Sequence, residues 1–273
     1  MRITDFQIAT LNSLRCVRIN EEDSILREVE NFSNPQNIQL ENTIKGCAFQ
    51  EDSDGGIAYY VVLSPENDIY AYFSLKCGLL FDKHGDLEII DSKKKLIQLI
   101  NKRKLLSERS ELADEIKKEL DKQIESIKDN LKSWIEIDEN DSKHKRVAKT
   151  YSGIEICHFC VNENARDKWD ALGLPEKNRQ GVTVFWNKIV PIVLKIKESV
   201  GLEYIYLFAA DSSSDEVLIN YYVDRMNFKR YEDVFAALPV YDFGCTLLCQ
   251  PVDSLIEASK DFYNDFNPDS DTI

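Results

Sequence analysis

The sequence predicts an α/β protein interrupted by one long helical segment. Three stretches carry this prediction. Residues 154–228 alternate between apolar strands and helices, residues 57–81 hold two β-rich runs joined by a short turn, and residues 92–136 contain neither glycine nor proline. With 273 residues, 43% of them hydrophobic, the chain is long enough to bury a substantial core, as one large domain or two small ones.

The N-terminal third reads as a strand, two helices and a pair of strands. Residues 2–9 alternate well enough to predict a first strand. Apolar side chains then recur at helical spacing in residues 21–32, and a second helix is expected over about 37–50, before the glycine-containing turn that follows it. Residues 57–64 and 69–81 are rich in β-branched and aromatic residues, and the short polar connection between them predicts an antiparallel pair.

The segment 92–136 predicts a long helix or helical hairpin. A 4-3-4-3 apolar spacing, typical of a coiled-coil seam, runs through Leu120, Ile124, Ile127, Leu131 and Trp134. Two interpretations stay open: a contact with a second copy or a protein partner, or an insertion that packs within its own chain. We expect residues 1–91 to form the N-terminal part of an α/β domain and residues 147–260 its C-terminal part. The helical insertion 92–146 lies between them, and an acidic, frayed tail covers 261–273.

Residues 154–228 form the most informative stretch. An apolar strand over 154–162 is followed by a turn that contains Gly181, then by an apolar helix and a second strand over 202–211. A tyrosine-containing helix that ends in Asn227 and Phe228 comes last. A strand that enters a helix through a glycine-bearing turn brings backbone N–H groups and the positive end of the helix dipole together. The order of elements therefore predicts a site for a phosphate or pyrophosphate.

This order resembles the central half of the GNAT superfamily, the acetyl-CoA-dependent N-acetyltransferases. The resemblance covers roughly residues 57–81 and 151–255. It implies a mixed, mostly antiparallel sheet with helices on both sides, in which acetyl-CoA is the cofactor. It also implies that an amine of an unidentified small molecule or protein attacks the thioester directly, without a covalent enzyme intermediate. The helical insertion has no counterpart in the resemblance.

The resemblance implies two sets of cofactor-binding residues. The pyrophosphate turn corresponds to Asn178, Arg179, Gln180, Gly181, Val182 and Thr183, of which only Gly181 matches the family pattern strictly. The main chain of Phe159, Cys160 and Val161 would pair with the pantetheine arm. Some twenty residues separate this strand from the turn, and they predict a short helix closed by Gly173 and Pro175, which is either a wall of the substrate pocket or a surface insertion.

The resemblance also suggests proton-transfer residues. Glu155 or His158 would take the proton from the attacking ammonium. Strict alternation along a strand puts Glu155 on the same face as Val161 and His158 on the other face. Tyr222, or its neighbour Tyr221, would protonate the departing thiolate. In the family this tyrosine lies four residues before the Gly of a Gly-Phe pair, whereas Tyr222 lies five before Asn227, and one residue rotates a helical side chain by about 100°.

Net charge and the cysteine pattern limit the kinds of partner, metal site and cellular location that we expect. The formal net charge of −14 argues against a phosphate-neutralising surface, so nucleic acid is an unlikely partner by this reasoning and an aminoacyl-tRNA-acetylating toxin is a disfavoured alternative. The other alternative is a GNAT-like binding module without turnover, acting through its helical insertion. Strands place Cys157 and Cys160 on opposite faces, so no metal site is expected. Seven cysteines without framework spacing, no signal-peptide pattern and no long apolar run predict a cytoplasmic protein that does not enter membranes.

Overall fold

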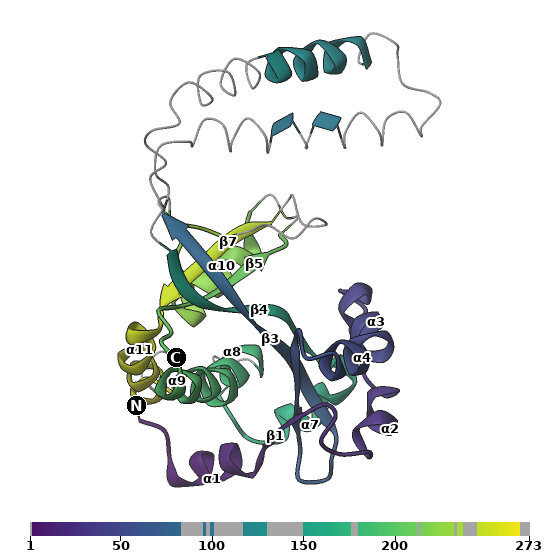
Figure 1. Ribbon diagram of the computed structural model, residues 1–273. Coiled ribbons are helices and arrows are strands. Elements are labelled where there is room, and N and C mark those ends of the chain that lie inside the picture. The colour runs from purple at the N-terminus through teal and green to yellow at the C-terminus, as the bar shows by residue number, and fades with distance from the viewer. Residues whose placement is uncertain are drawn as a thin grey trace. The chain divides into compact units, whose positions relative to one another are not determined.

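The computed structural model describes two compact units of the chain (Figure 1). The first unit comprises Met1–Leu80, Tyr151–Tyr231 and Gly244–Ile273, and the second comprises Phe81–Thr150 and Glu232–Phe243. The described residues are 2–82, 95–96, 99–100, 117–129, 150–175, 180–211, 213, 215–231, 234–236 and 245–267. None of the helices within these ranges is long and apolar enough to cross a membrane.

A mixed, mostly antiparallel sheet forms the centre of the first unit, as the sequence predicts. Its strands lie in the order β1-β2-β3-β4-β5-β7. The β1–β2, β2–β3 and β5–β7 pairs are antiparallel, whereas β4 and β5 are parallel. The strand bounds are β1 Arg15–Arg18, β2 Ala58–Leu63, β3 Ile69–Asp82, β4 Thr150–Val161, β5 Tyr204–Ala209 and β7 Thr246–Pro251. A short strand, β6 Val234–Ala236, falls in the second unit.

Helices cover both faces of this sheet (Figure 1), and each face has its own buried cluster of apolar side chains. One face is covered by α2 Ile25–Val29, α3 Ile38–Gly46 and α4 Ala48–Ser53. The other face packs against α1 Asp5–Ser13, α7 Arg166–Asp170, α8 Gln180–Val184, α9 Val190–Ser199, α10 Val217–Met226 and α11 Val252–Asn264. A 3-10 turn, η1 Glu163–Ala165, precedes α7.

The N-terminus differs from the sequence prediction, because residues 2–9 enter a helix where we expected a strand. Thr4 caps α1 through a capping box with Gln7, whose backbone N–H lies 3.3 Å from the Thr4 hydroxyl. The apolar residues that suggested alternation are not core residues: Phe6 is 69% exposed and Ile8 40% exposed. The buried residues are Gln7 and Leu11, which are four apart, as one face of a helix requires.

The helix after the predicted turn is wound in two ways. α8 passes without a break into a π-helix, Phe185–Ile189, and then into α9. Pro191 lies in the first turn of α9 and cannot donate to the carbonyl four residues back. The wider winding places the N–H of Val190 on the carbonyl of Phe185, so the chain passes the proline without breaking the helix.

The acidic C-terminal segment is packed as far as Asn267, which corrects the prediction that the chain frays after Asp261. α11 continues to Asn264, and Phe266 is fully buried. The side-chain oxygen of Asn267 accepts a hydrogen bond from the Gln7 amide at 2.8 Å, and its side-chain nitrogen donates to the carbonyl of Arg2 at 2.8 Å. An aromatic residue that fills a core position therefore outweighs the local polarity of this segment.

In the second unit, the predicted seam lies only partly among the described residues. Residues 117–129 are helical, with Leu120 and Ile124 buried. Leu131 and Trp134 lie outside the described residues, as does most of 92–136. The choice between a partner contact and an intramolecular insertion therefore stays a prediction.

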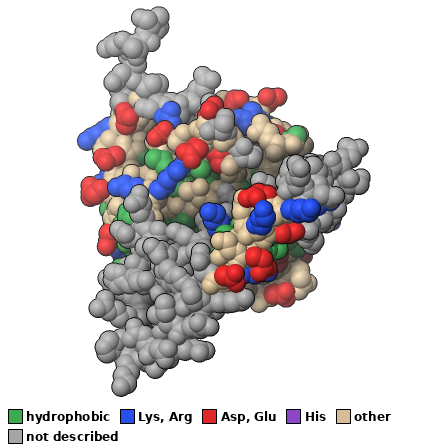
Figure 2. All heavy atoms as spheres, turned by 90° about the horizontal axis from the view of Figure 1, so that it is seen from above, with side chains coloured by type: hydrophobic (Ala, Val, Ile, Leu, Met, Phe, Trp, Pro, Cys, Tyr) green, Lys and Arg blue, Asp and Glu red, His purple; other side chains and the backbone are tan. Residues whose placement is uncertain are grey.

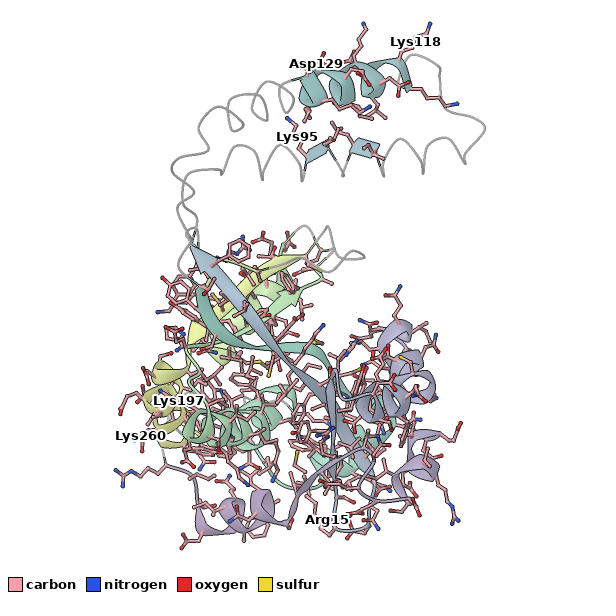
Figure 3. All side chains as sticks on the ribbon, in the orientation of Figure 1. Arg15, Lys95, Lys118, Asp129, Lys197 and Lys260 are labelled. Carbon is pink, nitrogen blue, oxygen red and sulfur yellow. The ribbon has the colours of Figure 1, made fainter. Side chains whose placement is uncertain are left out.

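The charged surface is mixed in sign. On the face in Figure 2, basic and acidic side chains are interspersed. Three cations labelled in Figure 3 each have a carboxylate partner: Arg15 pairs with Glu22 at 2.8 Å, Lys197 with Asp253, and Lys260 with Glu257 at 2.8 Å. Local pairing of this kind contributes little to stability but limits single-sign patches.

Candidate functional site

The centre of the candidate site is the point where β4 and β5 stop pairing. Their parallel register runs from Gly153 and Tyr204 to Ile156 and Leu207. Both strands continue beyond it, β4 to Val161 and β5 to Ala209, and β5 stays paired with β7 over this length. The facing main-chain edges beyond Ile156 and Leu207 therefore lie past the end of the β4–β5 register, and backbone N–H and C=O groups there can receive an extended ligand.

The side chains of β4 change faces at this same point. Ile154, Ile156, Phe159 and Val161 pack against the cluster beneath α8–α11, although Ile156 and Phe159 are three residues apart. Cys160 belongs to the cluster beneath α2–α4. Because successive strand residues alternate in direction, one extra residue must be accommodated between Ile156 and Phe159, as in a β-bulge.

This interruption corrects two sequence predictions. Glu155 lies between Ile154 and Ile156 and so points away from their cluster, opposite to Val161 and toward the same face as His158. Cys157 and Cys160 likewise share this face. Burial and the nearby Glu155 raise the pKa of the Cys157 thiol to about 12, so it stays protonated.

His158 lies in a hydrogen-bonded group that the sequence did not indicate. Its Nδ1 is 2.8 Å from the hydroxyl of Ser74 and 3.3 Å from that of Tyr59, whose ring stacks on the imidazole. The Tyr59 hydroxyl in turn donates to Glu51 across 2.5 Å. Burial lowers the pKa of His158, and the Glu51 carboxylate offsets part of this effect. His158 is thus a neutral imidazole near neutral pH.

Glu155 is held by a tyrosine that lies flat across the sheet. The Tyr206 hydroxyl is 3.3 Å from Glu155 Oε2. Its ring crosses β4 at Gly153 and reaches β3 at Gly78, where an added Cβ would lie 1.8 Å from the hydroxyl. Two glycines on neighbouring strands therefore make the slot that brings Tyr206 to Glu155. They are far apart in sequence, so no local pattern reveals them.

The start of α8 contains four of the predicted cofactor residues. Gln180, Gly181, Val182 and Thr183 are all buried in its first turns, whereas Asn178 and Arg179 lie outside the described residues. Thr183 is fully buried, so its hydroxyl is not exposed at the helix start.

Gly181 lies inside the helix rather than in the turn before it. A Cβ at this position would lie 2.8 Å from the Tyr221 hydroxyl and 3.8 Å from Cζ of Phe159. The glycine therefore lets a side chain from α10 approach the helix start and brings three predicted site residues together. Gln180 anchors the same turn by donating to the carbonyl of Tyr70 at 2.6 Å, and its Oε1 is buried without a hydrogen-bond partner in the described part of the chain.

The tyrosine helix α10 ends with a wider turn. Asn227 adopts a left-handed conformation with φ of 60°, and its N–H bonds to the carbonyl of Tyr222, five residues back. An ordinary left-handed cap closes with a bond from four residues back. Tyr222 lies five residues before Asn227, one more than in the family pattern. The turn that ends α10 contains one additional residue, which matches this offset. Tyr222 packs edge-on against Phe228, and burial raises its pKa, so its phenol stays protonated at neutral pH.

The side chain of Asp211 binds the free N–H groups at the start of α10, whose N-cap residue, Glu216, makes no side-chain capping bond. Asp211 Oδ2 accepts from the N–H groups of Leu218 and Ile219 at 2.7 and 3.1 Å. These bonds and those from Ser213 lower the pKa of Asp211 to about 2. The carboxylate follows directly after β5 and fixes how the helix leaves the strand.

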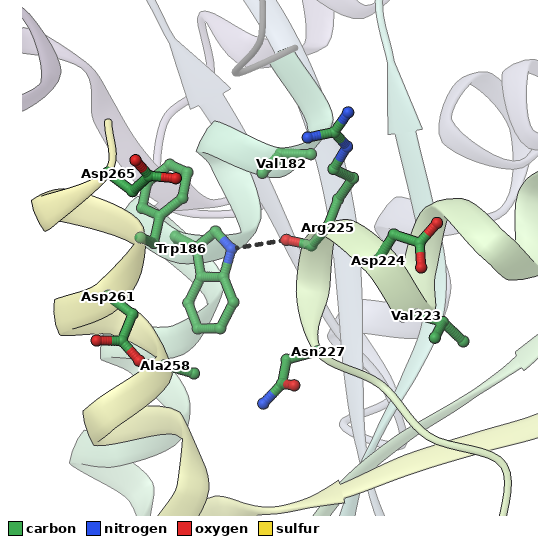
Figure 4. Close-up of a pocket in the computed structure, with 10 residues that line it drawn as sticks. Val182, Trp186, Val223, Asp224, Arg225, Asn227, Ala258, Asp261 and Asp265 are labelled. Atoms are coloured by element: carbon green, nitrogen blue, oxygen red, sulfur yellow. Dashed lines mark hydrogen bonds between the residues drawn. The ribbon is translucent and has the colours of Figure 1, made fainter. Parts of the chain in front are cut away.

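A separate pocket of about 350 Å³ lies between α8, α10 and α11 (Figure 4). Val182 and Trp186 form one side, and the Trp186 indole N–H donates to the carbonyl of Arg225 at 3.1 Å. Three carboxylates, of Asp224, Asp261 and Asp265, also line it, together with one cation, Arg225. Because carboxylates outnumber the cation, this lining does not suit a phosphate group.

Comparison with known proteins gives fold-level similarities only. No protein family matches the chain, and no curated protein matches it. Similar solved structures include a mutant of the AtaT toxin, with 10% identity, a TM-score of 0.49 and coverage of 90% of this chain and 94% of that one. AtaTR bound with acetyl-CoA has 10% identity and a TM-score of 0.49, with coverage of 90% of this chain and 98% of that one. A KacTA–DNA complex has 10% identity and a TM-score of 0.49, with coverage of 91% of this chain and 99% of that one. TM-scores below 0.5 leave family and activity to be argued from this chain's own geometry.

These structures correct one prediction about partners. AtaT has been solved in complex with acetyl-methionyl-tRNAfMet, with 9% identity and a TM-score of 0.46, and KacTA with DNA. The prediction that nucleic acid is an unlikely partner, made from net charge, was therefore wrong. A net charge sums the whole chain and does not describe any one surface. The predicted cofactor is also the one found in the AtaTR structure.

Proposed function

We propose that this chain is an acyl-CoA-dependent N-acyltransferase with acetyl-CoA as its donor. The observation that carries the proposal is the separation of β4 from β5 directly beside the start of α8 and the tyrosines of α10. A pantetheine arm is extended and contains amide groups, so it can hydrogen-bond to strand edges as a further strand would. The order of strands, turn and helices agrees with the GNAT resemblance over the same residues.

The residues present fit such a donor at its pantetheine end. The main chain of Phe159, Cys160 and Val161 borders the separated edge, and the buried Oε1 of Gln180 offers an acceptor that a ligand N–H would satisfy. The acidic pocket of Figure 4 does not fit the phosphates of the cofactor. We therefore assign it no part in cofactor binding.

The proposed chemistry is direct transfer. When bound, the donor supplies an activated thioester. An uncharged amine attacks its carbonyl carbon, a C–N bond forms and the C–S bond breaks. The β4 main-chain N–H groups near the bulge polarise the carbonyl, the Glu155 and His158 face takes the proton from the amine, and the protonated phenol of Tyr222 or Tyr221 returns one to the leaving thiolate. Alignment of the two reactants supplies much of the acceleration.

The first experiment is calorimetry with acetyl-CoA, and CoA as the product control. Binding in the micromolar to low millimolar range supports the proposal, and its absence at millimolar cofactor contradicts it. The matched variants are Gly181→Val, whose branched side chain would collide with Tyr221 at the helix start, and Gly46→Ala, where an added Cβ meets nothing within 4 Å. Only the first should weaken binding.

The second experiment measures release of free CoA thiol with a panel of amines. The panel contains diamines, peptides with free N-termini, and aminoacyl-tRNA, since AtaT has been solved with an acetylated aminoacyl-tRNA. Acetylated product identified by mass spectrometry supports the proposal. Binding of acetyl-CoA without turnover of any of these amines would favour the alternative, a binding module that retains the cleft.

A further inference from the structure

We propose that Glu51 and Tyr59 position His158 as the general base of acyl transfer by fixing which imidazole nitrogen carries hydrogen. This inference rests on the proposed function and extends it to two residues on α4 and β2 that the sequence did not indicate. The hydrogen would be held on Nδ1, leaving the Nε2 lone pair to accept the proton from the acceptor amine.

The assignment follows from counting hydrogens along the chain of contacts. A carboxylate only accepts hydrogen bonds, so the 2.5 Å contact between Glu51 and Tyr59 uses the single hydrogen of the Tyr59 hydroxyl. That hydroxyl also lies 3.3 Å from His158 Nδ1, and toward this nitrogen it can then only accept. We infer that Nδ1 is the donor in this contact. Ser74, 2.8 Å from the same nitrogen, can accept as well because a serine oxygen has two lone pairs, whereas in the Nε2–H tautomer its hydroxyl would donate to Nδ1.

The surrounding groups suit a neutral imidazole that becomes charged during the reaction. On proton transfer, the attacking amine gives up one proton to Nε2 and His158 becomes an imidazolium, with Nδ1–H already directed at Tyr59 and Ser74. The Glu51 carboxylate then stabilises the cation through Tyr59. Other titratable groups nearby include the Glu155 carboxylate, which shares this face of β4 and accepts from Tyr206. Burial raises the pKa of the thiols of Cys47, before α4, and Cys157, beside His158, so neither thiol contributes charge.

The arrangement also distinguishes His158 from Glu155. Glu155 is engaged by Tyr206 across 3.3 Å, whereas the contacts at His158 occupy Nδ1 and fix the ring between β2 and β3. An imidazole with its pKa lowered by burial is largely unprotonated at neutral pH and can act without first losing a proton.

The test is the tautomeric state of His158, measured on the full chain by long-range ¹H–¹⁵N NMR correlations of the histidine rings. The chain has three histidines, so the spectrum of His158→Gln assigns the signal. We expect the Nδ1–H tautomer at pH 7. Glu51→Gln and Tyr59→Phe should shift the population toward Nε2–H. Tyr72→Phe is the matched control: this buried tyrosine of the same cluster donates to the Leu40 carbonyl at 2.7 Å, and its loss should leave the tautomer unchanged.

The wild-type spectrum is decisive by itself, so the proposal is testable even if a variant fails to fold. A predominantly Nε2–H ring in the wild-type protein overturns the inference. This readout needs no turnover, and calorimetry with acetyl-CoA is independent of it. Failure to bind the cofactor would therefore refute the proposed function, whereas the wrong tautomer would refute only the role of Glu51 and Tyr59.

With an active acceptor, kinetics add a second readout. His158→Gln should lower kcat by roughly 10²-fold or more, and Tyr59→Phe by a smaller factor, while the Kd for acetyl-CoA stays unchanged. Glu51→Gln removes the charge that favours the imidazolium, so the acidic limb of the kcat/KM profile should move to lower pH. A profile and a kcat that are unchanged in both variants would contradict the positioning role.

Discussion

Tyr206 and Gly78 allow a quantitative test of how β4 and β5 are held together below their point of separation. In Gly78→Ala the new Cβ would lie 1.8 Å from the Tyr206 hydroxyl and 2.9 Å from Cζ. Reaching a normal contact of about 3.5 Å requires the hydroxyl to move by roughly 1.7 Å. The same ring also passes close to Gly153, where an added Cβ would lie 2.9 Å from its edge. We expect overpacking to destabilise the protein by about 1–3 kcal/mol.

A double-mutant cycle isolates this contact. Urea unfolding of Gly78→Ala, Tyr206→Phe and the double variant gives the three free-energy changes. Tyr206→Phe removes the colliding oxygen and a long hydrogen bond to Glu155, which should cost about 0.5–1.5 kcal/mol alone. The double variant should then be more stable than the sum by about 1 kcal/mol. If the free-energy changes of the two single variants add up to that of the double variant within about 0.3–0.5 kcal/mol, Gly78 does not provide the space that the Tyr206 ring occupies. Gly46→Ala, with nothing near its new Cβ, is the control and should be neutral or slightly stabilising.

Three further predictions concern stability. Phe266→Ala should destabilise the protein by about 3–5 kcal/mol in urea unfolding, because the ring is fully buried; a loss below about 1 kcal/mol would mean that the C-terminal segment is not docked. Because burial lowers the pKa of His158, folding disfavours its protonation and stability should fall with pH below about 6.5; His158→Gln should flatten this dependence between pH 7 and 5, and an unchanged slope would contradict it. The Asp211 carboxylate, with its pKa near 2, stabilises the folded protein above about pH 4 and loses that effect as the pH falls toward 2; Asp211→Asn should therefore reduce the loss of stability over that range, measured by thermal melts.

The sheet and its flanking helices could largely be predicted from the sequence, because hydrophobic periodicity reports burial over segments of this length. β2, β3, β4 and β5 lie where apolar runs indicated them. α1 was mistaken for a strand, because apolar residues that point into solvent imitate alternation. In that case the cap at Thr4 was the better signal, since a capping box defines a helix start whatever follows it.

The site was less predictable, because its contacts join elements far apart in the chain. The hydroxyl of Tyr59 meets His158 across 99 residues, and the slot for Tyr206 depends on glycines of two different strands. The faces of β4 were misassigned for a different reason. One additional residue in a strand reverses every side chain after it, and nothing in the composition of that strand marks the position. Glu155 and His158 were therefore placed on opposite faces of β4, whereas the structure puts them on the same face; their roles stay predictions.

The wide turn at the end of α10 sets the direction of Tyr222 although this residue lies one position away from the family pattern, and it yields a last prediction. Asn227 holds φ at 60°, a conformation that β-branched residues adopt only with strain and glycine adopts freely. Asn227→Gly should preserve the wide turn, the stability and the Kd for acetyl-CoA. Asn227→Val should destabilise by about 1–2 kcal/mol and weaken cofactor binding, because the turn that sets the direction of Tyr222 would rewind. If Asn227→Val kept wild-type stability and affinity, the wider turn would not be what places Tyr222, and Tyr221, beside Gly181, would be the better candidate for the acid.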